Sequence, residues 1–181
     1  MVSIKETQYI KGNNNIIIRS ARIEDAEELL KHVHKIHEET TFLLREPEEF
    51  DLTIEEEEKF ISLSISSDNE AFIIAEANGK VAGSCTLKIG SLKRERHKGT
   101  LGIALQEDFW GLGIGTKLME TVINWGKTKR LIKISLKVDT SNRRAINLYN
   151  KMGFEVEGKL LKDKVLKNGS YKNSYEMALF L

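Results

Sequence analysis

Three glycines, Gly111, Gly113 and Gly115, stand close together in the stretch QEDFWGLGIGTKLMET. A strand-like segment, residues 98–105, precedes them, and apolar residues with helical spacing follow. Glycine inside a helix costs about 0.5–1 kcal/mol relative to alanine, so a cluster at a helix start needs a backbone reason. A helix N terminus presents unpaired N–H groups, and residues without side chains let an anion come close. The stretch therefore predicts an anion-binding turn.

Two common phosphate-binding patterns do not fit this stretch. A Walker loop requires G-x-x-x-x-G-K-[ST], whereas Thr116 stands before Lys117 here. A dinucleotide fingerprint requires G-x-G-x-x-G near the first strand, with an acidic residue about 20 positions further on, and the spacing here differs. For the stretch in isolation, a glycine turn that serves only tight packing is an equal alternative.

A second segment, residues 142–154, reads NRRAINLYNKMGF. Together the two segments resemble the Gcn5-related N-acetyltransferase (GNAT) superfamily, whose acyl-CoA motif runs Arg/Gln-x-x-Gly-x-Gly/Ala and whose second signature runs N-x-x-A-x-x-L-Y-x-x-x-G-F. Close matching is confined to residues 102–154, while the order of elements agrees from residue 16 onward. Trp110 departs from the pattern, because it stands where Arg or Gln is usual. Trp at this position and the tail YKNSYEMALFL resemble the ribosomal-protein and polyamine acetyltransferases, although Asn173 replaces a common Asp.

The resemblance implies acetyl-CoA (coenzyme A) as cosubstrate. Its pyrophosphate would lie on the backbone amides of residues 111–116, and its pantetheine would pair like an extra strand beside residues 103–105. Asn142 would hydrogen-bond the cofactor or cap a helix, or do both, and Lys151 would meet the ribose phosphate or be an exposed helix cation. The implied cofactor-binding residues are Ile103, Leu105, Trp110, Gly111, Leu112, Gly113, Ile114, Gly115, Thr116, Asn142 and Lys151. No residue spacing indicates a metal site.

Tyr149 is the catalytic residue that the resemblance implies, as general acid toward the departing thiolate. The alternative for Tyr149 is an aromatic side chain packed against the sheet. The backbone N–H of Leu105 would stabilise the oxyanion of the tetrahedral intermediate. The general base is not identified by the sequence, and the side chains available near the expected cleft are Glu38, Glu39, Glu107, His37 and His97.

The implied reaction moves an acetyl group from acetyl-CoA, by direct attack, to the primary amine of a small molecule such as an amino acid or polyamine. Lys137 stands where relatives that modify protein N termini carry Glu, which argues against an N-terminal alanine as acceptor. Acetylation of a protein N terminus or lysine, and a non-catalytic acyl-CoA-binding module, are the alternatives. Specificity is expected in residues 38–53, which mix apolar and acidic side chains.

The N-terminal half predicts a strand, two helices and a hairpin. Residues 16–19 are strand-like, and helical spacing begins at Ile23. Thr53 followed by Glu56 fits a capping box before a second helix, with a buried stripe expected at Ile54, Ile61 and Ile65. Residues 71–77 and 81–89 read as strands joined by a type I′ turn at residues 78–79, Asn-Gly.

The C-terminal half continues with strand 98–105, a helix through about residue 129, and strand 131–138, in which Ile132, Ile134, Leu136 and Val138 alternate with polar residues. A helix over 142–152, ended by Gly153, and two more strands follow. This order predicts an α/β (α+β) domain. The resemblance specifies a GNAT fold with a mixed central sheet of about six to seven strands, splayed fourth (98–105) and fifth (131–138) strands, and about four flanking helices.

Composition narrows the class of protein further. The length of 181 residues indicates a single domain, 1–181. Lys and Arg number 28 against 27 Asp and Glu, which argues against nucleic acid as a partner. Cys85 is the single cysteine, and no apolar run has membrane-spanning or signal-peptide length, so a cytoplasmic protein without membrane partners is expected. Homodimers are common in the family, and the sequence leaves that partner open.

Overall fold

The computed structural model describes residues 4–49 and 51–181. Phe50, which belongs to the segment expected to set specificity, and residues 1–3 lie outside the described residues. The strands of the sheet are β1 (Thr7–Lys11), β2 (Asn14–Ser20), β3 (Glu70–Ala77), β4 (Lys80–Ile89), β5 (Lys98–Leu105), β6 (Lys133–Asp139), β7 (Glu155–Val165) and β8 (Tyr171–Phe180). The helices are α1 (Ala26–Glu39), α2 (Ile54–Ser66), α3 (Ile114–Thr128) and α4 (Arg143–Lys151).

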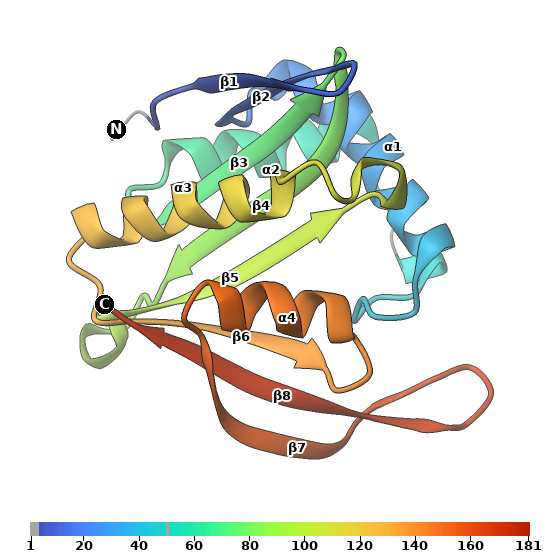
Figure 1. The fold of residues 1–181 in the computed structure, drawn as a ribbon, viewed down its shortest axis with the longest axis vertical. Coiled ribbons are helices and arrows are strands. Elements are labelled where there is room, and N and C mark those ends of the chain that lie inside the picture. The colour runs from blue at the N-terminus through green and yellow to red at the C-terminus, as the bar shows by residue number, and fades with distance from the viewer. Residues whose placement is uncertain (1–3, 50) are drawn as a thin grey trace.

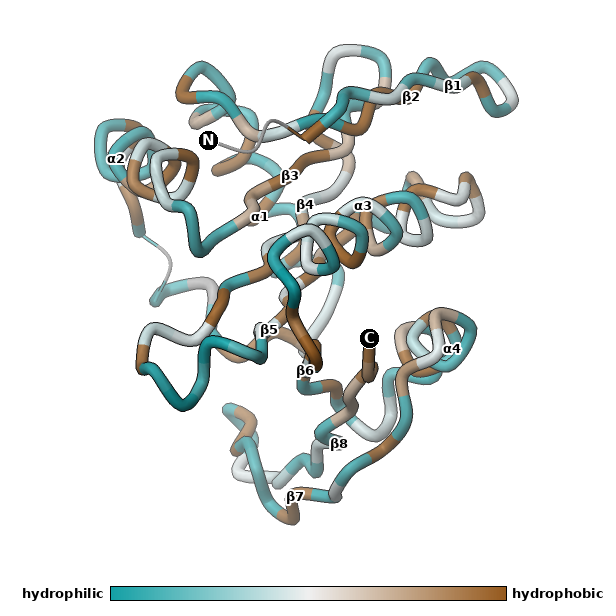
Figure 2. The backbone as a smooth tube through the Cα atoms, turned by 90° about the vertical axis from the view of Figure 1, so that its left-hand side faces the viewer, coloured by the Kyte–Doolittle hydropathy of each residue, from teal (hydrophilic) through white to brown (hydrophobic). Residues whose placement is uncertain are grey.

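The strands form one sheet in the order β1-β2-β3-β4-β5-β6-β8-β7 (Figure 1). Neighbours are antiparallel except β5 and β6, which run parallel, so the sheet is mixed as predicted. Figure 2 shows α1 and α2 on one face of the sheet and α3 and α4 on the other. Each face has its own cluster of buried apolar side chains. Within the described ranges, no helix has the length and apolar character needed to cross a bilayer.

The strand count exceeds the predicted six or seven by one strand, β1, at the edge of the sheet. Its sequence, TQYIK, is mostly exposed and shows no apolar alternation. The strand therefore depends on pairing with β2 through a turn at Gly12 (φ 60°) rather than on a pattern of its own. The hydroxyl of Tyr9 in β1 donates a long hydrogen bond (3.4 Å) to the carbonyl of Leu112. The unpredicted strand thus supports the glycine turn.

Local turn and cap signals are confirmed. Thr53 Oγ1 accepts from the Glu56 N–H at 3.2 Å, and the Glu56 carboxylate accepts from the Thr53 N–H at 2.9 Å. Asn78 (φ 52°) and Gly79 (φ 81°) both adopt the left-handed conformation that a type I′ turn requires. The predicted stripe on α2 is wrong at Ile54, which is 44% exposed and belongs to neither buried cluster. The apolar periodicity therefore predicts a buried face that includes the first turn of α2, whereas Ile54 in that turn is exposed.

β6 presents its alternate side chains to opposite faces of the sheet. Ile134, Leu136 and Val138 are buried in the cluster on the α3 side. Ile132 was expected to share that face, but it precedes the strand and is 56% exposed. Because side chains alternate along a strand, Asp139 at the end of β6 belongs to the opposite face, the face of α1 and α2.

The splay predicted for the strands at 98–105 and 131–138 is confirmed, and they are β5 and β6. Pairing between them covers the register from Lys98 opposite Lys133 to Thr100 opposite Ser135. Beyond this point β5 stays paired with β4 as far as Leu105, and β6 stays paired with β8 as far as Asp139. The two strand ends therefore diverge, as Figure 1 shows at the arrowheads of β5 and β6.

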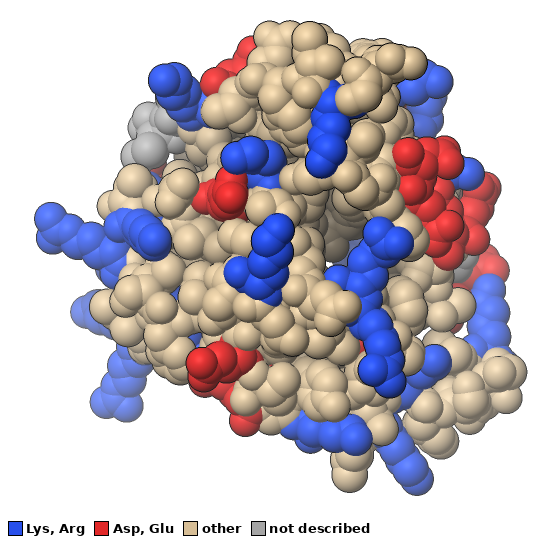
Figure 3. All heavy atoms as spheres, viewed as in Figure 1, with Lys and Arg blue, Asp and Glu red and all other residues tan. Residues whose placement is uncertain are grey.

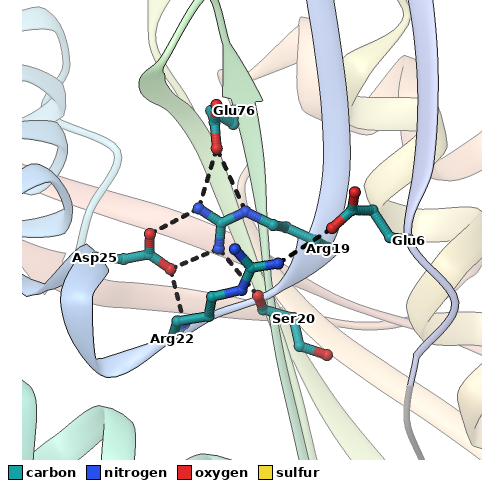
Figure 4. A network of polar contacts seen from close by, with 6 residues as sticks. All are labelled: Glu6, Arg19, Ser20, Arg22, Asp25 and Glu76. Atoms are coloured by element: carbon teal, nitrogen blue, oxygen red, sulfur yellow. Dashed lines mark hydrogen bonds and ion pairs between the residues drawn. The ribbon is translucent and has the colours of Figure 1, made fainter.

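The start of α1 is fixed to the sheet by a buried arginine (Figure 4). Arg19 of β2 donates two hydrogen bonds of 2.7 Å to the Asp25 carboxylate, one from each terminal nitrogen. It also donates to Glu76 of β3 at 3.0 and 3.3 Å. Two carboxylates and a fork of donors satisfy the buried guanidinium, so the network specifies how α1 docks.

His32 of α1 is fully buried and couples folding to pH. Its Nε2 lies 3.3 Å from Ser84 Oγ, and its Nδ1 lies 3.1 Å from Gln106 Nε2, an amide nitrogen that donates. Nδ1 is therefore the acceptor, and the neutral ring donates from Nε2. Burial lowers the pKa of His32 from 6.5 to about 4. The neutral form stabilises the fold above pH 6.5, and this contribution is lost as the pH falls toward 4.

The free energy of unfolding is expected to fall more steeply between pH 7 and 4.5 in the wild type than in His32→Gln, by about 2–3 kcal/mol, because only the wild type must protonate a buried imidazole. Chemical denaturation of both proteins at matched pH values measures this difference. Parallel stability curves would show that His32 titrates normally in the folded protein.

Candidate functional site

The glycine turn places two of its three glycines in conformations that other residues rarely adopt. Gly111 has φ 79° and Gly113 has φ 82°, and an added Cβ at either position would meet no atom within 4 Å. Backbone conformation, rather than crowding, is therefore the reason for glycine at both positions. Gly113 is the N-cap residue of α3. The predicted turn from strand to helix is present.

The first turn of α3 carries amide groups with no acceptor inside the helix. The Lys117 N–H donates to Gly113 O at 3.1 Å, which is the first hydrogen bond of the helical pattern. The N–H groups of residues 114–116 precede it and have no carbonyl four residues earlier within the helix. Together with the positive end of the helix dipole, they form a site suited to a phosphate group.

Gly115 has a different reason for being glycine. It is buried in α3, and an added Cβ would lie 3.0 Å from Leu148 Cδ2 of α4. The missing side chain allows α3 and α4 to approach each other. The packing alternative thus applies to Gly115, whereas Gly111 and Gly113 are required by the turn.

Basic side chains surround a hollow on this face of the molecule. Figure 3, which shows the face carrying α3 and α4, has a hollow near its centre with Lys and Arg side chains at its border. The first turn of α4, on the same face, carries Arg143 and Arg144, both exposed. A group of Asp and Glu side chains lies to the right of the hollow, on the side of α1. Basic groups therefore border the hollow, and the largest acidic group in this view lies on the α1 side.

Hydrogen-bond alternation along β5 directs the amide groups of Ile103 and Leu105 toward the gap between β5 and β6. The Gln106 N–H donates to Ala82 O at 3.0 Å, so this pair is a hydrogen-bonded one of the β4–β5 ladder. Such pairs alternate in antiparallel sheets, and Leu105 opposite Gly83 therefore points its N–H and C=O away from β4. Ile103, two residues earlier, does the same. The open edge that a pantetheine strand would need is present.

Trp110 connects the end of β5 to α4. Its indole N–H donates to Leu105 O at 3.1 Å, and the Arg144 guanidinium carbon lies 4.0 Å from its ring centroid. The indole nitrogen is thereby engaged within the protein, and the carbonyl of Leu105 already has a donor. Trp110, the residue that departs from the family pattern, is therefore held by a hydrogen bond where the glycine turn begins. The Arg144 guanidinium lies over its ring.

Tyr149 is buried in α4, with 6% of its surface exposed. Burial raises the pKa of Tyr149 above its usual value of 10, and the nearby Cys85 thiol group raises it further. The phenol is therefore protonated at neutral pH, as a general acid must be. Cys85 of β4 lies opposite Ile103 of β5. Tyr149 and Cys85 belong to the same buried cluster, on the face of the sheet that carries α3 and α4.

Asn142 and Lys151 stand at the two ends of α4. Asn142 Oδ1 accepts from the Ala145 N–H at 3.1 Å, which makes Asn142 the helix cap that the sequence offered as one of its roles. Lys151 is exposed in the last turn.

The base candidates do not share one location. Glu39 Oε2 accepts from the Glu107 N–H at 2.9 Å, so α1 meets the segment after β5. His37 Nδ1 donates to Val33 O at 2.8 Å within α1. His97 lies at the closed end of the β5–β6 pair, because its carbonyl accepts from the Ile132 N–H at 2.8 Å. His97 is therefore remote from the diverging strand ends.

Sequence reasoning missed Asp139, the last residue of β6. Its carboxylate is buried, and Oδ1 accepts from the N–H and the hydroxyl of Ser141 at 2.8 and 2.6 Å. Lys164 Nζ of β7 lies 3.5 Å from Oδ2 and donates to Phe42 O at 2.9 Å. The sequence signal that could have identified Asp139 is a carboxylate at the end of a strand with alternating apolar residues. Its contact with Lys164 could not be predicted, because the two residues are distant in the sequence.

Comparisons with known proteins agree with this geometry. A profile of the acetyltransferase (GNAT) family matches residues 30–154. The chain is 29% identical over 130 residues to spermidine N(1)-acetyltransferase of Escherichia coli (strain K12), a match covering 68% of each chain. It is 34% identical over 110 residues to the L-amino acid N-acetyltransferase AaaT of the same strain, covering 59% of this chain and 65% of the relative.

The fold is similar to that of a solved acetyltransferase of the GNAT family from Streptococcus pneumoniae. The TM-score is 0.87 at 34% identity, and the match covers 92% of this chain and 99% of that chain. The two proteins therefore share one fold over nearly the full length of that relative.

Proposed function

Because the chain belongs to the GNAT family of acetyltransferases, which use acetyl-CoA, we propose that it acetylates the primary amine of a small molecule such as an amino acid or a polyamine. The observation that carries the proposal is the divergence of β5 and β6 beside the free amides at the start of α3. That arrangement offers an open strand edge and an anion site next to each other. A non-catalytic acyl-CoA-binding module is the alternative, and turnover distinguishes the two.

In this proposal the pyrophosphate of acetyl-CoA binds the amides of residues 111–116, and its pantetheine pairs with the backbone groups of Ile103 and lies beside the N–H of Leu105. The exposed Lys151 and the amide group of Asn142 are further contacts from α4. The basic border of the hollow in Figure 3 supports this side for the phosphates. Engagement of Leu105 O by Trp110 leaves the N–H of Leu105 for the ligand.

The reaction that these groups support is direct transfer. The neutral amine attacks the thioester carbonyl carbon, and the N–H of Leu105 stabilises the negative charge that develops on the carbonyl oxygen. The C–S bond then breaks, and Tyr149 gives its proton to the departing thiolate. The proton released by the new amide nitrogen passes to water. Tyr149 is protonated at neutral pH because burial raises its pKa, and the phenolate left after the transfer regains a proton from water.

Two observations support a small amine as the acceptor: the acidic side chains on the α1 side of the hollow, and the substrates for which the relatives are named. The E. coli relatives are named for spermidine and for L-amino acids. Acidic side chains gather beside the hollow on the side of α1, which attracts cations.

A panel of amines tests the proposed function. The panel contains spermidine, cadaverine, L-amino acids, and peptides with a free N terminus or a lysine, and a thiol reagent follows the release of coenzyme A. We expect release with small amines at rates well above those with peptides. Calorimetric binding of coenzyme A without turnover of any amine would favour the non-catalytic module, and faster turnover of peptides would favour protein acetylation.

A further inference from the structure

A short strap crosses the diverging ends of β5 and β6 on the face opposite α3 and α4. It consists of residues 39–42, at the end of α1, and both of its ends are anchored. On the β5 side, the Glu39 carboxylate accepts from the Glu107 N–H at 2.9 Å. On the β6 side, Phe42 O accepts from Lys164 Nζ at 2.9 Å, and this ammonium also faces Asp139. An acceptor that approaches from this face meets the strap.

The Asp139 carboxylate at the second anchor has an unfilled hydrogen-bonding capacity. Its side chain is fully buried, Oδ1 is satisfied by Ser141, and Oδ2 makes no hydrogen bond within the described ranges. Its neighbour Lys164 lies 3.5 Å from Oδ2, beyond the usual length of a charge-assisted hydrogen bond, about 2.7–2.9 Å. A buried anion with a free lone pair is costly unless a cation approaches it more closely.

Asp139 is ionised at neutral pH. Burial by itself raises the pKa of Asp139, but hydrogen bonds from Ser141 and the charges of Lys164 and Lys172 outweigh burial, so the pKa lies below its usual value. A permanently ionised carboxylate favours the protonated form of an amine beside it. It therefore suits an ammonium group that does not react, because the attacking amine must be neutral.

The side chain of Lys164 carries the same chemical group as such a ligand, a primary ammonium on an alkyl chain. Its primary ammonium, on a side chain only 10% exposed, lies between a buried carboxylate and the carbonyl of Phe42. We propose that Asp139 and Phe42 O form a subsite for the non-reacting ammonium of a diamine or polyamine acceptor, and that Lys164 occupies this subsite until the acceptor displaces it. The inference rests on the proposed function and names the acceptor class.

Two amines of equal chain length, cadaverine with two amino groups and n-pentylamine with one, test the subsite. The measured quantity is the ratio of kcat/KM for the diamine to that for the monoamine. Asp139→Asn keeps an oxygen for Ser141 but removes the charge, and we expect this ratio to fall about tenfold, mainly through the KM of cadaverine. Lys164→Met vacates the subsite, and the ratio is expected to rise.

Lys167→Met is the matched control. Lys167 pairs with Glu46 and Glu48 of the segment between α1 and α2, but it does not contact Asp139. Its removal loosens the segment that follows the strap, so the ratio should stay at the wild-type value if charge at Asp139 is what selects the diamine. A rise as large as that of Lys164→Met would overturn the proposal in favour of a simple loosening of the strap.

Calorimetric titration of cadaverine into the coenzyme A complex gives a readout without turnover. We expect weaker binding to Asp139→Asn than to the wild type and tighter binding to Lys164→Met. Equal binding to all three proteins would overturn the subsite even if the wild type acetylates amines. Absence of turnover with every amine, alongside charge-dependent cadaverine binding, would instead overturn the proposed function. Should Asp139→Asn fail to fold, Lys164→Met alone decides by the direction of its change.

Discussion

Replacement of Tyr149 by Phe is expected to lower the rate of acetyl transfer by about 10²–10⁴-fold, the range for one acid–base group. The substitution removes the buried hydroxyl and leaves an aromatic ring of nearly the same volume, so the packing beside Phe154 is kept. The loss is incomplete because a thiol, with a reference pKa of about 8.5, is a tolerable leaving group without an acid.

Single-turnover kinetics with acetyl-CoA and a productive amine measure this effect without interference from product release. Tyr171→Phe is the matched control, because it removes the same hydroxyl from a side chain that is 60% exposed on β8. The control should turn over at the wild-type rate. A Tyr149→Phe protein with wild-type single-turnover rates would assign Tyr149 to packing alone.

Substitution of Gly113 by Ala is expected to raise the KM for acetyl-CoA by about 10–100-fold, with a smaller effect on kcat. The φ of 82° at Gly113 costs an alanine about 1–2 kcal/mol, so the turn relaxes toward negative φ. The amides of residues 114–116 then no longer converge on one phosphate. Loss of one or two hydrogen bonds to a charged group, each worth about 1.5–3 kcal/mol, accounts for the expected range.

Gly79→Ala provides a matched control for Gly113→Ala. Gly79 has nearly the same φ, 81°, and its added Cβ would likewise meet nothing within 4 Å, but it lies in the β3–β4 hairpin. Both variants should lose similar stability in chemical denaturation, whereas only Gly113→Ala should lose affinity for coenzyme A in calorimetry. Equal affinities would mean that the turn does not bind the phosphates.

Elements defined by local backbone chemistry were predictable from the sequence. The capping box at Thr53, the hairpin turn at Asn78 and the left-handed glycine at Gly153 each depend on residues within a few positions of one another. Their conformational preferences operate before any tertiary contact forms. The splayed pair of strands was anticipated by resemblance to a family, through two linked segments rather than through periodicity.

The structure around the candidate site was decided by contacts between residues that are distant in the sequence. β1 exists through pairing with β2, Gly115 is glycine because Leu148 packs against it, and Trp110 turns toward Leu105 and Arg144. The strap that covers the acceptor face depends on a hydrogen bond between residues 122 positions apart, Phe42 and Lys164. Side-chain type and spacing thus determined the glycine turn that we propose binds the cofactor, because its geometry is local. The partners of Asp139 were set only when β6, β7 and the end of α1 came together, because burial and ion pairing arise from the packed arrangement.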